Sequence, residues 1–310
     1  MSGIYIHIPF CKNACVYCDF HFSTVLKSKE LVLSSIQKEL GFFCSDFNFP
    51  VETIYFGGGT PSFMKTDEIE NILNTIFKNY HTSSDIEITI EINPDDACEE
   101  KLKTYKRMGI NRLSVGVQSF ENDILKWMKR RHSVEDVYKC LNQMQQTGFD
   151  NFSIDLIYGV PGLSDTKWIK TIEKALKFSP SHISAYMLTV EPKTELNFLV
   201  KNRKTLVVSD KQYALQMQIL SEKLKAEGYE HYEVSNFSKP GFSARHNSAY
   251  WLGKPYLGTG PSAHSYYHNK RRINISNNWI YSKRITDKKP WYEEEILSEK
   301  DNYNELVLTR

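Results

Sequence analysis

The chain has 310 residues, of which 41% are hydrophobic and 25% are charged. A chain of this length buries about three quarters of its unfolded surface, and its composition excludes a disordered, collagen-like or coiled-coil protein. With 39 Lys and Arg against 37 Asp and Glu, the net charge of +2 creates no overall attraction to nucleic acid or anionic lipid. No apolar run approaches the length of about 18 residues that spans a membrane, and no signal peptide precedes the first strand, so we expect a cytoplasmic protein.

Six short runs rich in β-branched and aromatic residues alternate with stretches of helical periodicity. The expected strands span residues 3–9, 51–56, 86–92, 112–117, 151–158 and 182–189. Alternating strands and helices predict parallel strands joined by right-handed crossovers. Because six units are too few for a closed eightfold barrel, we expect an α/β fold with a partial (β/α)6 barrel. Its chemistry should lie at the carboxyl ends of the strands.

The composition changes near residue 235. A helix over 210–227 and a strand over 229–234 still follow the alternation, whereas the remaining chain is rich in Gly, Pro, Asn, Tyr and Trp and is less periodic. We therefore expect a core domain over residues 1–234 and a C-terminal region over 235–310. The last residues follow an apolar helical pattern without a stop signal, which indicates a truncated C-terminal extension.

Three of the six cysteines, Cys11, Cys15 and Cys18, crowd together at the end of the first expected strand. A disulfide framework would be denser and would belong to a shorter secreted chain, so these thiols favour a metal site. Three thiolates at this spacing can ligate three irons of a 4Fe–4S cluster and leave the fourth iron open. Zinc is the alternative, with His7 or His21 as the fourth ligand.

The pattern CxxxCxxC at this place in a six-unit β/α chain resembles the radical S-adenosylmethionine (SAM) superfamily. The resemblance implies that the open iron binds the methionine part of SAM. It also implies that one electron from a donor splits the sulfonium and gives a 5′-deoxyadenosyl radical. The residues that the resemblance assigns to SAM binding are Tyr5, Tyr17, Gly58, Gly59, Thr60, Glu91, Gln118, Arg130 and Asp155. Taken singly, each also has an ordinary structural explanation, such as helix capping, a surface charge or a turn.

Four segments together resemble one group within this superfamily. They are YIHIPFC at 5–11, FGGGTP at 56–61, EINP at 91–94 and GVQSF at 116–120. This group contains the oxygen-independent coproporphyrinogen III dehydrogenases (HemN) and the related haem chaperones (HemW), and the resemblance covers nearly the whole chain. Two departures favour the chaperone branch. Phe20 stands where the dehydrogenases carry a fourth cysteine, and the first strand begins at Gly3, which leaves no room for their N-terminal extension.

Residues 245–251, RHNSAYW, match the HNxxYW signature of the chaperone branch. His246 is therefore the candidate axial ligand of haem iron, with Tyr250 and Trp251 available to line a porphyrin face. The alternative is that His246 forms hydrogen bonds in a turn while the two aromatic side chains pack at the barrel mouth. His264 is a second candidate ligand, and the basic tract 268–272 can meet haem propionates, a partner or solvent.

The resemblance implies a haem chaperone that binds a 4Fe–4S cluster, SAM and haem and passes haem to an acceptor haem protein, such as a respiratory one. No residue is assigned a catalytic role, because the residues do not reveal whether radical chemistry is used in the transfer. One alternative is an enzyme that oxidatively decarboxylates the propionates of coproporphyrinogen III to vinyl groups. A structural zinc protein on a β/α scaffold is another alternative.

Overall fold

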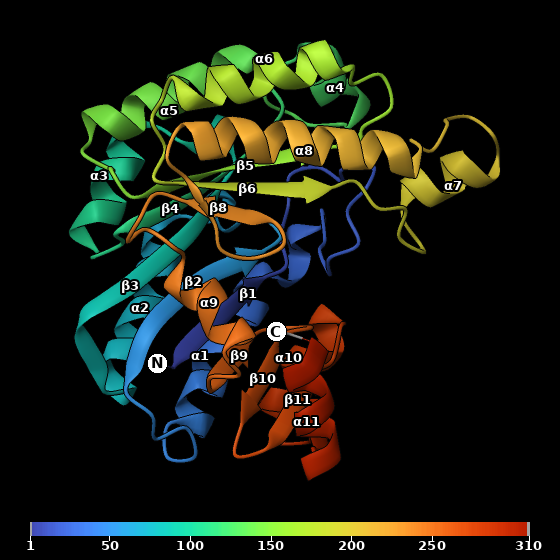
Figure 1. Ribbon diagram of the computed structural model, residues 1–310. Helices are drawn as coiled ribbons and strands as arrows, with labels where there is room; N and C mark the ends of the chain where they lie inside the picture. The colour runs from blue at the N-terminus through green and yellow to red at the C-terminus, as the bar shows by residue number, and fades with distance from the viewer. Residues whose placement is uncertain (1, 309–310) are drawn as a thin grey trace.

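The computed structural model describes residues 2–308, and strands alternate with helices over most of this length (Figure 1). Six parallel strands pair in chain order, each with the next. They are β1 (Gly3–Ile8), β2 (Val51–Gly58), β3 (Thr82–Ile92), β4 (Arg112–Gln118), β5 (Phe152–Tyr158) and β6 (His182–Met187). This order confirms the α/β fold. Two strands differ from the predicted ranges: β3 begins at Thr82 rather than 86, and β6 ends at Met187 rather than 189.

The connections between these strands carry helices. The α-helices are α1 (Lys29–Phe43), α2 (Thr66–Asn79), α3 (Glu99–Arg107), α4 (Asn122–Trp127), α5 (Val134–Gln146) and α6 (Asp165–Leu176). Short 3-10 helices lie in the same connections, at η1 (Leu26–Ser28), η2 (Pro61–Phe63) and η3 (Pro94–Asp96). Gly109 and Gly148 follow α3 and α5 with φ values of 89° and 76°, a conformation that glycine adopts without strain and that ends a helix.

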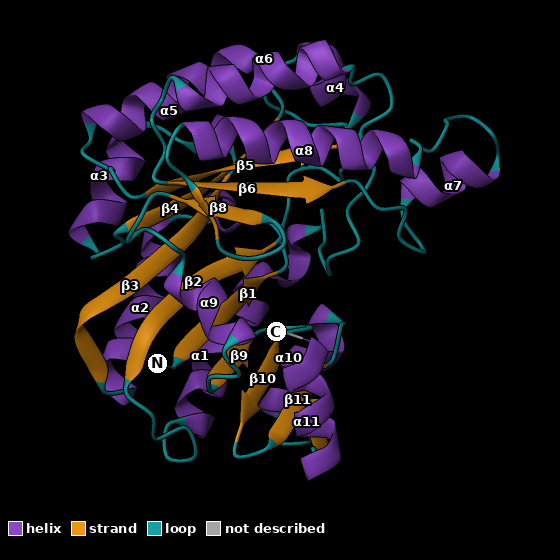
Figure 2. Ribbon diagram, in the orientation of Figure 1, coloured by secondary structure: helices purple, strands orange, loops and turns teal. Residues whose placement is uncertain are grey.

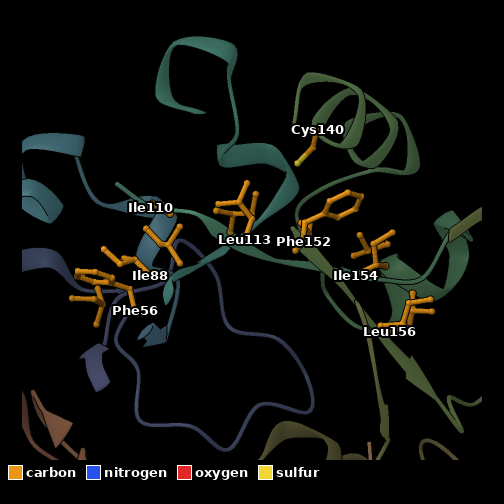
Figure 3. Packing of buried hydrophobic residues seen from close by; sticks show 14 of the residues in the cluster. Phe56, Ile88, Ile110, Leu113, Cys140, Phe152, Ile154 and Leu156 are labelled. Atoms are coloured by element: carbon orange, nitrogen blue, oxygen red, sulfur yellow. The ribbon is translucent and has the colours of Figure 1, made fainter. Parts of the chain in front are cut away.

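One face of the six-stranded sheet is apolar and is covered by these helices. Along each strand every second side chain points to this face, as strand geometry requires. Figure 3 shows Phe56, Ile88 and Leu113 of successive strands together with Phe152, Ile154 and Leu156 of β5. All of these side chains are at most 2% exposed. The main hydrophobic core therefore lies between the sheet and its outer helices.

The opposite face of the same strands is polar. Its side chains are Tyr5, His7, Thr53, Tyr55, Thr89, Glu91, Arg112, Ser114, Ser153, Asp155, His182, Ser184 and Tyr186. Tyr5 of β1 and His182 of β6 line one cavity although four strands separate them, so the sheet curls around this polar face. The result is a partial barrel with its hydrophobic core outside and polar groups inside.

The chain after β6 extends the sheet at both of its edges. Helices α7 (Glu195–Lys201) and α8 (Asp210–Ala226) lead to β7 (Glu230–His231) and β8 (Asn236–Ser238), where β8 pairs antiparallel with β6. On the other edge, β9 (Tyr256–Thr259) pairs parallel with β1, followed by β10 (His264–Tyr267), β11 (Lys270–Asn274) and β12 (Tyr292–Ile296). The remaining helices are α9 (Arg245–Trp251), α10 (Asn278–Thr286) and α11 (Glu299–Leu308).

The strand expected over 229–234 forms only at Glu230–His231 (β7), which pairs with β8 in a hairpin. One sheet joins residues on both sides of position 235, and the division into two domains at that position stays a prediction. Helix α9 lies on the side of the strands opposite to α2 (Figure 2). None of the helices within residues 2–308 is long and apolar enough to cross a membrane.

A buried carboxyl group fastens the C-terminal edge to the barrel. Glu39 of α1 is fully buried and accepts hydrogen bonds from the backbone N–H of Gly260 and from the side chains of Asn274, Tyr281 and Trp291. These donors come from four separate segments of the last quarter of the chain. Because each donor is satisfied by the same carboxyl group, Glu39 fixes how β11 and α10 sit against α1.

Replacing Glu39 by Leu should destabilise the protein by about 3 kcal/mol or more, because four buried donors lose their acceptor. Urea unfolding followed by tryptophan fluorescence measures the change, since Trp291 is one of the four donors. The matched control is Glu30→Leu, an exposed residue of the same helix, which should leave stability nearly unchanged. Equal stabilities for the two variants would show that the Glu39 cluster contributes little.

Candidate functional site

A cavity of about 400 Å³ lies at the carboxyl ends of the strands. Its walls contain Cys11, Cys15 and Cys18. They also contain most of the residues that the sequence assigned to SAM, namely Tyr17, Gly58, Gly59, Thr60, Glu91, Gln118, Arg130 and Asp155. The volume is within the range of cavities that bind cofactor-sized ligands. The fold therefore brings together residues that are up to 144 positions apart (155 − 11).

The backbone of the cysteine loop is held by distant segments. Cys11 N donates to the carbonyl of Ser23 at 3.1 Å, and Val16 N donates to the carbonyl of Met128 at 3.2 Å. The carbonyl of Val16 in turn accepts from the backbone N–H of Leu196 at 2.8 Å, at the start of α7. These bonds tie the loop to the segment after α4 and to α7, so its position is fixed by the protein itself.

The histidines that could complete a zinc site are bonded elsewhere. His7 Nε2 lies 2.8 Å from the carbonyl oxygen of His21, and His21 Nε2 lies 2.8 Å from Asn278 Oδ1. Within residues 2–308, no three His, Cys, Asp or Glu side chains converge closely enough to hold one metal ion. The cysteine side chains instead face a shared cavity, as ligands of a larger group would.

Two polar side chains approach the cysteine sulfurs. The hydroxyl of Thr60 donates to Cys11 Sγ at 3.3 Å, and Arg130 Nη1 donates to Cys15 Sγ at 3.5 Å. Burial raises the pKa of the Cys11 thiol to about 11 and that of Cys18 to about 12. Donors beside the sulfurs favour the thiolate form, which is the form that ligates iron.

The glycine segment at the end of β2 packs directly against the end of β1. Gly58 has φ 107°, and a Cβ there would lie 2.6 Å from the His7 ring. A Cβ on Gly59 would lie 2.8 Å from the carbonyl oxygen of Ile8, to which Gly59 N donates at 2.9 Å. The N–H of Gly59 is used within the sheet and that of Gly58 is directed at the Glu91 carboxyl group, so the close packing requires glycine at both positions.

Two half-buried carboxyl groups, on β3 and β5, line the cavity. Glu91 Oε1 accepts from the hydroxyl of Tyr55 at 2.9 Å, and burial raises the pKa of Glu91 to about 7. Asp155 accepts from Ser114 and Ser153, both at 2.9 Å, and burial raises its pKa as well. Each carboxyl group keeps acceptor capacity for ligand hydroxyl or amino groups.

The end of β4 is strained. Gln118 has φ 65° at a shift in the register between β4 and β5, a conformation uncommon for a residue other than glycine. Its Oε1 atom is buried without a hydrogen-bond partner, and so is Arg130 Nε. Arg130 is anchored by Nη2, which donates to Asn93 Oδ1 and to the carbonyl of Gly116. Unsatisfied polar atoms in the wall of a cavity fit a polar ligand such as SAM.

Tyr5 departs from the expected group. It lines a second, smaller cavity rather than the one with the cysteines, and its hydroxyl lies 3.1 Å from His7 Nδ1. Tyr55, Tyr186 and Asn93 line the larger cavity although sequence reasoning did not select them. The polar residue at every second position of the six strands was the signal that could have found Tyr55 and Tyr186.

His246 is buried at the amino ends of β2 and β3. Its Nδ1 lies 2.8 Å from Thr53 Oγ1 and its Nε2 lies 2.9 Å from the hydroxyl of Tyr250. Burial lowers the pKa of His246 to about 3, so the ring is neutral. Both ring nitrogens are thus engaged, as the hydrogen-bonding alternative described for this residue requires. Haem ligation by His246 stays a prediction, and it requires Nε2 to exchange Tyr250 for iron.

The other candidate haem contacts have different surroundings. His264 begins β10 and is exposed. The basic tract forms ion pairs: Lys270 and Arg272 both contact Glu294 of β12, and Arg272 also contacts Asp46. This tract therefore serves mainly to pair β11 with its neighbours. Phe20, where the dehydrogenases have a fourth cysteine, is 66% exposed at the edge of the larger cavity.

Comparisons with known proteins identify the superfamily. The model of the radical SAM superfamily matches residues 5–175. A solved structure of Escherichia coli coproporphyrinogen III oxidase (HemN), a radical SAM enzyme, superposes with a TM-score of 0.87 at 23% identity. The match covers 99% of this chain and 74% of that one. The chain belongs to the radical SAM superfamily, whose members hold a 4Fe–4S cluster and SAM.

Curated relatives narrow the assignment further. The heme chaperone HemW of Bacillus subtilis is 35% identical over 313 residues, covering 99% of this chain and 83% of that protein. The heme chaperone HemW of Lactococcus lactis is also 35% identical, covering 98% of this chain and 79% of that protein. Within the radical SAM superfamily, the chain belongs to the family of HemW heme chaperones.

If the carboxyl group of Glu91 accepts hydrogen bonds from SAM, affinity for SAM should rise between pH 6 and pH 8. A pKa of about 7 means that Glu91 is mostly protonated at pH 6 and mostly ionised at pH 8, and the ionised form is the better acceptor. Glu91→Gln should bind SAM at least about tenfold more weakly at pH 8 and lack this rise.

Calorimetric titration of SAM at both pH values tests this expectation. Comparison with Glu91→Gln removes the contribution of the titrating amino group of SAM, which both proteins share. Glu99→Gln, a change at an exposed residue of α3, is the matched control. Identical pH profiles for the wild type and Glu91→Gln would remove Glu91 from the SAM site.

Proposed function

We propose that this protein is a cytoplasmic haem chaperone, which binds haem and transfers it to an acceptor haem protein. The observation that carries the proposal is the 35% identity to the heme chaperone HemW of Bacillus subtilis along nearly the whole chain. The exposed Phe20 also supports this function over decarboxylation of coproporphyrinogen III, since the dehydrogenases carry a cysteine at that position.

In this proposal Cys11, Cys15 and Cys18 hold the cluster. SAM binds in the adjoining cavity, held by Tyr17, Gly58, Gly59, Thr60, Glu91, Gln118, Arg130 and Asp155. Tyr5 does not line this cavity and instead supports it through its contacts with His7 and Tyr55. A reduced cluster of this type can supply one electron to cleave bound SAM. The residues of the chain position the ligands: Arg130 lies beside Cys15, and the carboxyl groups of Glu91 and Asp155 accept polar hydrogens of SAM.

The cluster assignment is tested by Cys15→Ala. After anaerobic reconstitution, the variant should lose the broad brown absorbance of the cluster, because only two of the three thiolate ligands remain. Cys98→Ala is the matched control, since Cys98 is exposed and does not line the cavity. A Cys15→Ala spectrum equal to that of the wild type would contradict the assignment.

The haem site is proposed to include His246, whose Nε2 is bonded to the hydroxyl of Tyr250. Iron must displace that hydroxyl. Tyr250→Phe should therefore strengthen haem binding about 2- to 10-fold, because one competing hydrogen bond is removed. His246→Ala should abolish saturable binding, whereas His264→Ala should leave it unchanged.

A titration of haem into the cluster-loaded protein, read from the Soret band, measures all four proteins. Transfer is then followed by mixing the haem-loaded wild type with an apo b-type haem protein. Weaker binding by Tyr250→Phe together with normal binding by His246→Ala would move the ligand away from this segment. Decarboxylation of coproporphyrinogen III without haem transfer would instead support the enzymatic alternative.

A further inference from the structure

A second cavity of about 190 Å³ lies inside the partial barrel, toward the amino ends of β4 and β6. It shares Tyr55, Ser114 and Tyr186 with the larger cavity, and helix α9 forms its wall on the side away from the cysteines through Ala244, Asn247 and neighbouring residues. At about 30 Å³ per water molecule, it holds a small hydrated ligand. It is too small for the cofactor-sized ligands that the larger cavity suits.

Arg112, the first residue of β4, is the charged residue in this wall. Arg112 is only 2% exposed. Within the described chain, no hydrogen bond or ion pair reaches its guanidinium group, and Nε is also shielded from solvent. A guanidinium group that is buried without an anionic partner is costly, whereas the same group can bind an oxyanion through two parallel hydrogen bonds.

Two carboxyl groups on β3 and β5, the strands that flank β4, are used by other donors. Glu87 of β3 accepts from the backbone N–H groups of Arg245 and His246 at the start of α9. Asp155 accepts from two serines and faces the larger cavity. Among the residues that line the second cavity, none is an aspartate or a glutamate. Arg112 acts on Asp155 through its charge but donates no hydrogen bond to it, so the donor groups of the guanidinium remain for a ligand.

Polar groups with free hydrogen-bonding capacity surround the same space. Asn247 Nδ2 is buried with its amide facing the hydroxyl of Tyr232, and Asn236 Oδ1 is a buried acceptor without a partner. His182 is committed, because its Nδ1 lies 2.9 Å from Ser153 Oγ and its Nε2 lies 2.8 Å from the hydroxyl of Tyr232. Burial lowers the pKa of His182, so this ring is neutral and Arg112 alone is positive in this wall.

We propose that the second cavity is a binding site for a small oxyanion, a carboxylate or a phosphate, held by Arg112 with the side-chain amide nitrogen of Asn247 as a second donor. The ligand is either a free inorganic anion or the acidic group of a small organic acid. This site adjoins the cluster and SAM cavity through three shared wall residues, and it does not depend on the proposed haem-carrying function.

The test is a calorimetric titration of the cluster-loaded protein with inorganic phosphate and, separately, with propionate, in chloride of matched ionic strength. At least one of the two anions should bind the wild type, and Arg112→Met should weaken that binding at least tenfold. Arg107→Gln is the matched control, because it removes an exposed positive charge of α3 that is outside the cavity. Binding of phosphate alone identifies an inorganic ligand, and binding of propionate alone identifies an organic acid.

Stability provides a second measurement. Without either anion, Arg112→Met should unfold at the same temperature as the wild type or higher, because it removes a buried unpaired charge. Added ligand should raise the unfolding temperature of the wild type and of Arg107→Gln but not that of Arg112→Met. Asn247→Ala is a milder variant that should also weaken binding. Absence of binding to the wild type, or equal binding by Arg112→Met, would overturn the proposal.

Discussion

The two faces of the six parallel strands have opposite polarity, and the other features of the molecule depend on this alternation. Ile, Leu, Val and Phe at every second position bury one face under the helices, so the intervening positions are forced to the inside of the curl. There, the buried Arg112 and the half-buried Glu91 and Asp155 lie among hydroxyl and amide groups. Buried polar groups need partners, and the interior supplies only part of them, which leaves two cavities whose walls are ready to bind polar ligands.

Helix α9 connects the HNxxYW segment to the SAM cavity through a short series of contacts. Glu87 accepts the N–H groups at the start of α9, and the ring of His246 stacks on Tyr55 with 5.3 Å between ring centres. The hydroxyl of Tyr55 then donates to Glu91, on the wall of the larger cavity. The signature residues therefore support the carboxyl group that we propose for SAM, in addition to any contact with haem. A change at His246 should be interpreted with both roles in view.

The sequence predicted the elements that depend on local pattern. Strand and helix periodicity located the six parallel strands, and cysteine spacing marked the loop that lies in the large cavity. Pairing between distant residues was not predictable from such patterns. The strand expected over 229–234 is shortened to β7, which pairs with β8 because β8 pairs with β6. Tyr5 faces a different cavity because the sheet curls. Arg112 and Tyr55 were overlooked for the same reason: a single polar residue in a strand has no recognisable meaning until the opposite wall is known.

The hydrogen bonds of the cysteine loop hold it in place independently of the cluster. Cys11 and Val16 are held by the backbone of Ser23 and Met128, and the carbonyl of Val16 is held by Leu196, so none of these bonds needs iron. Because these bonds join backbone groups of the chain, the path of the loop does not depend on bonds between sulfur and iron. A cluster inserted into the folded chain should therefore find its three thiols already in place.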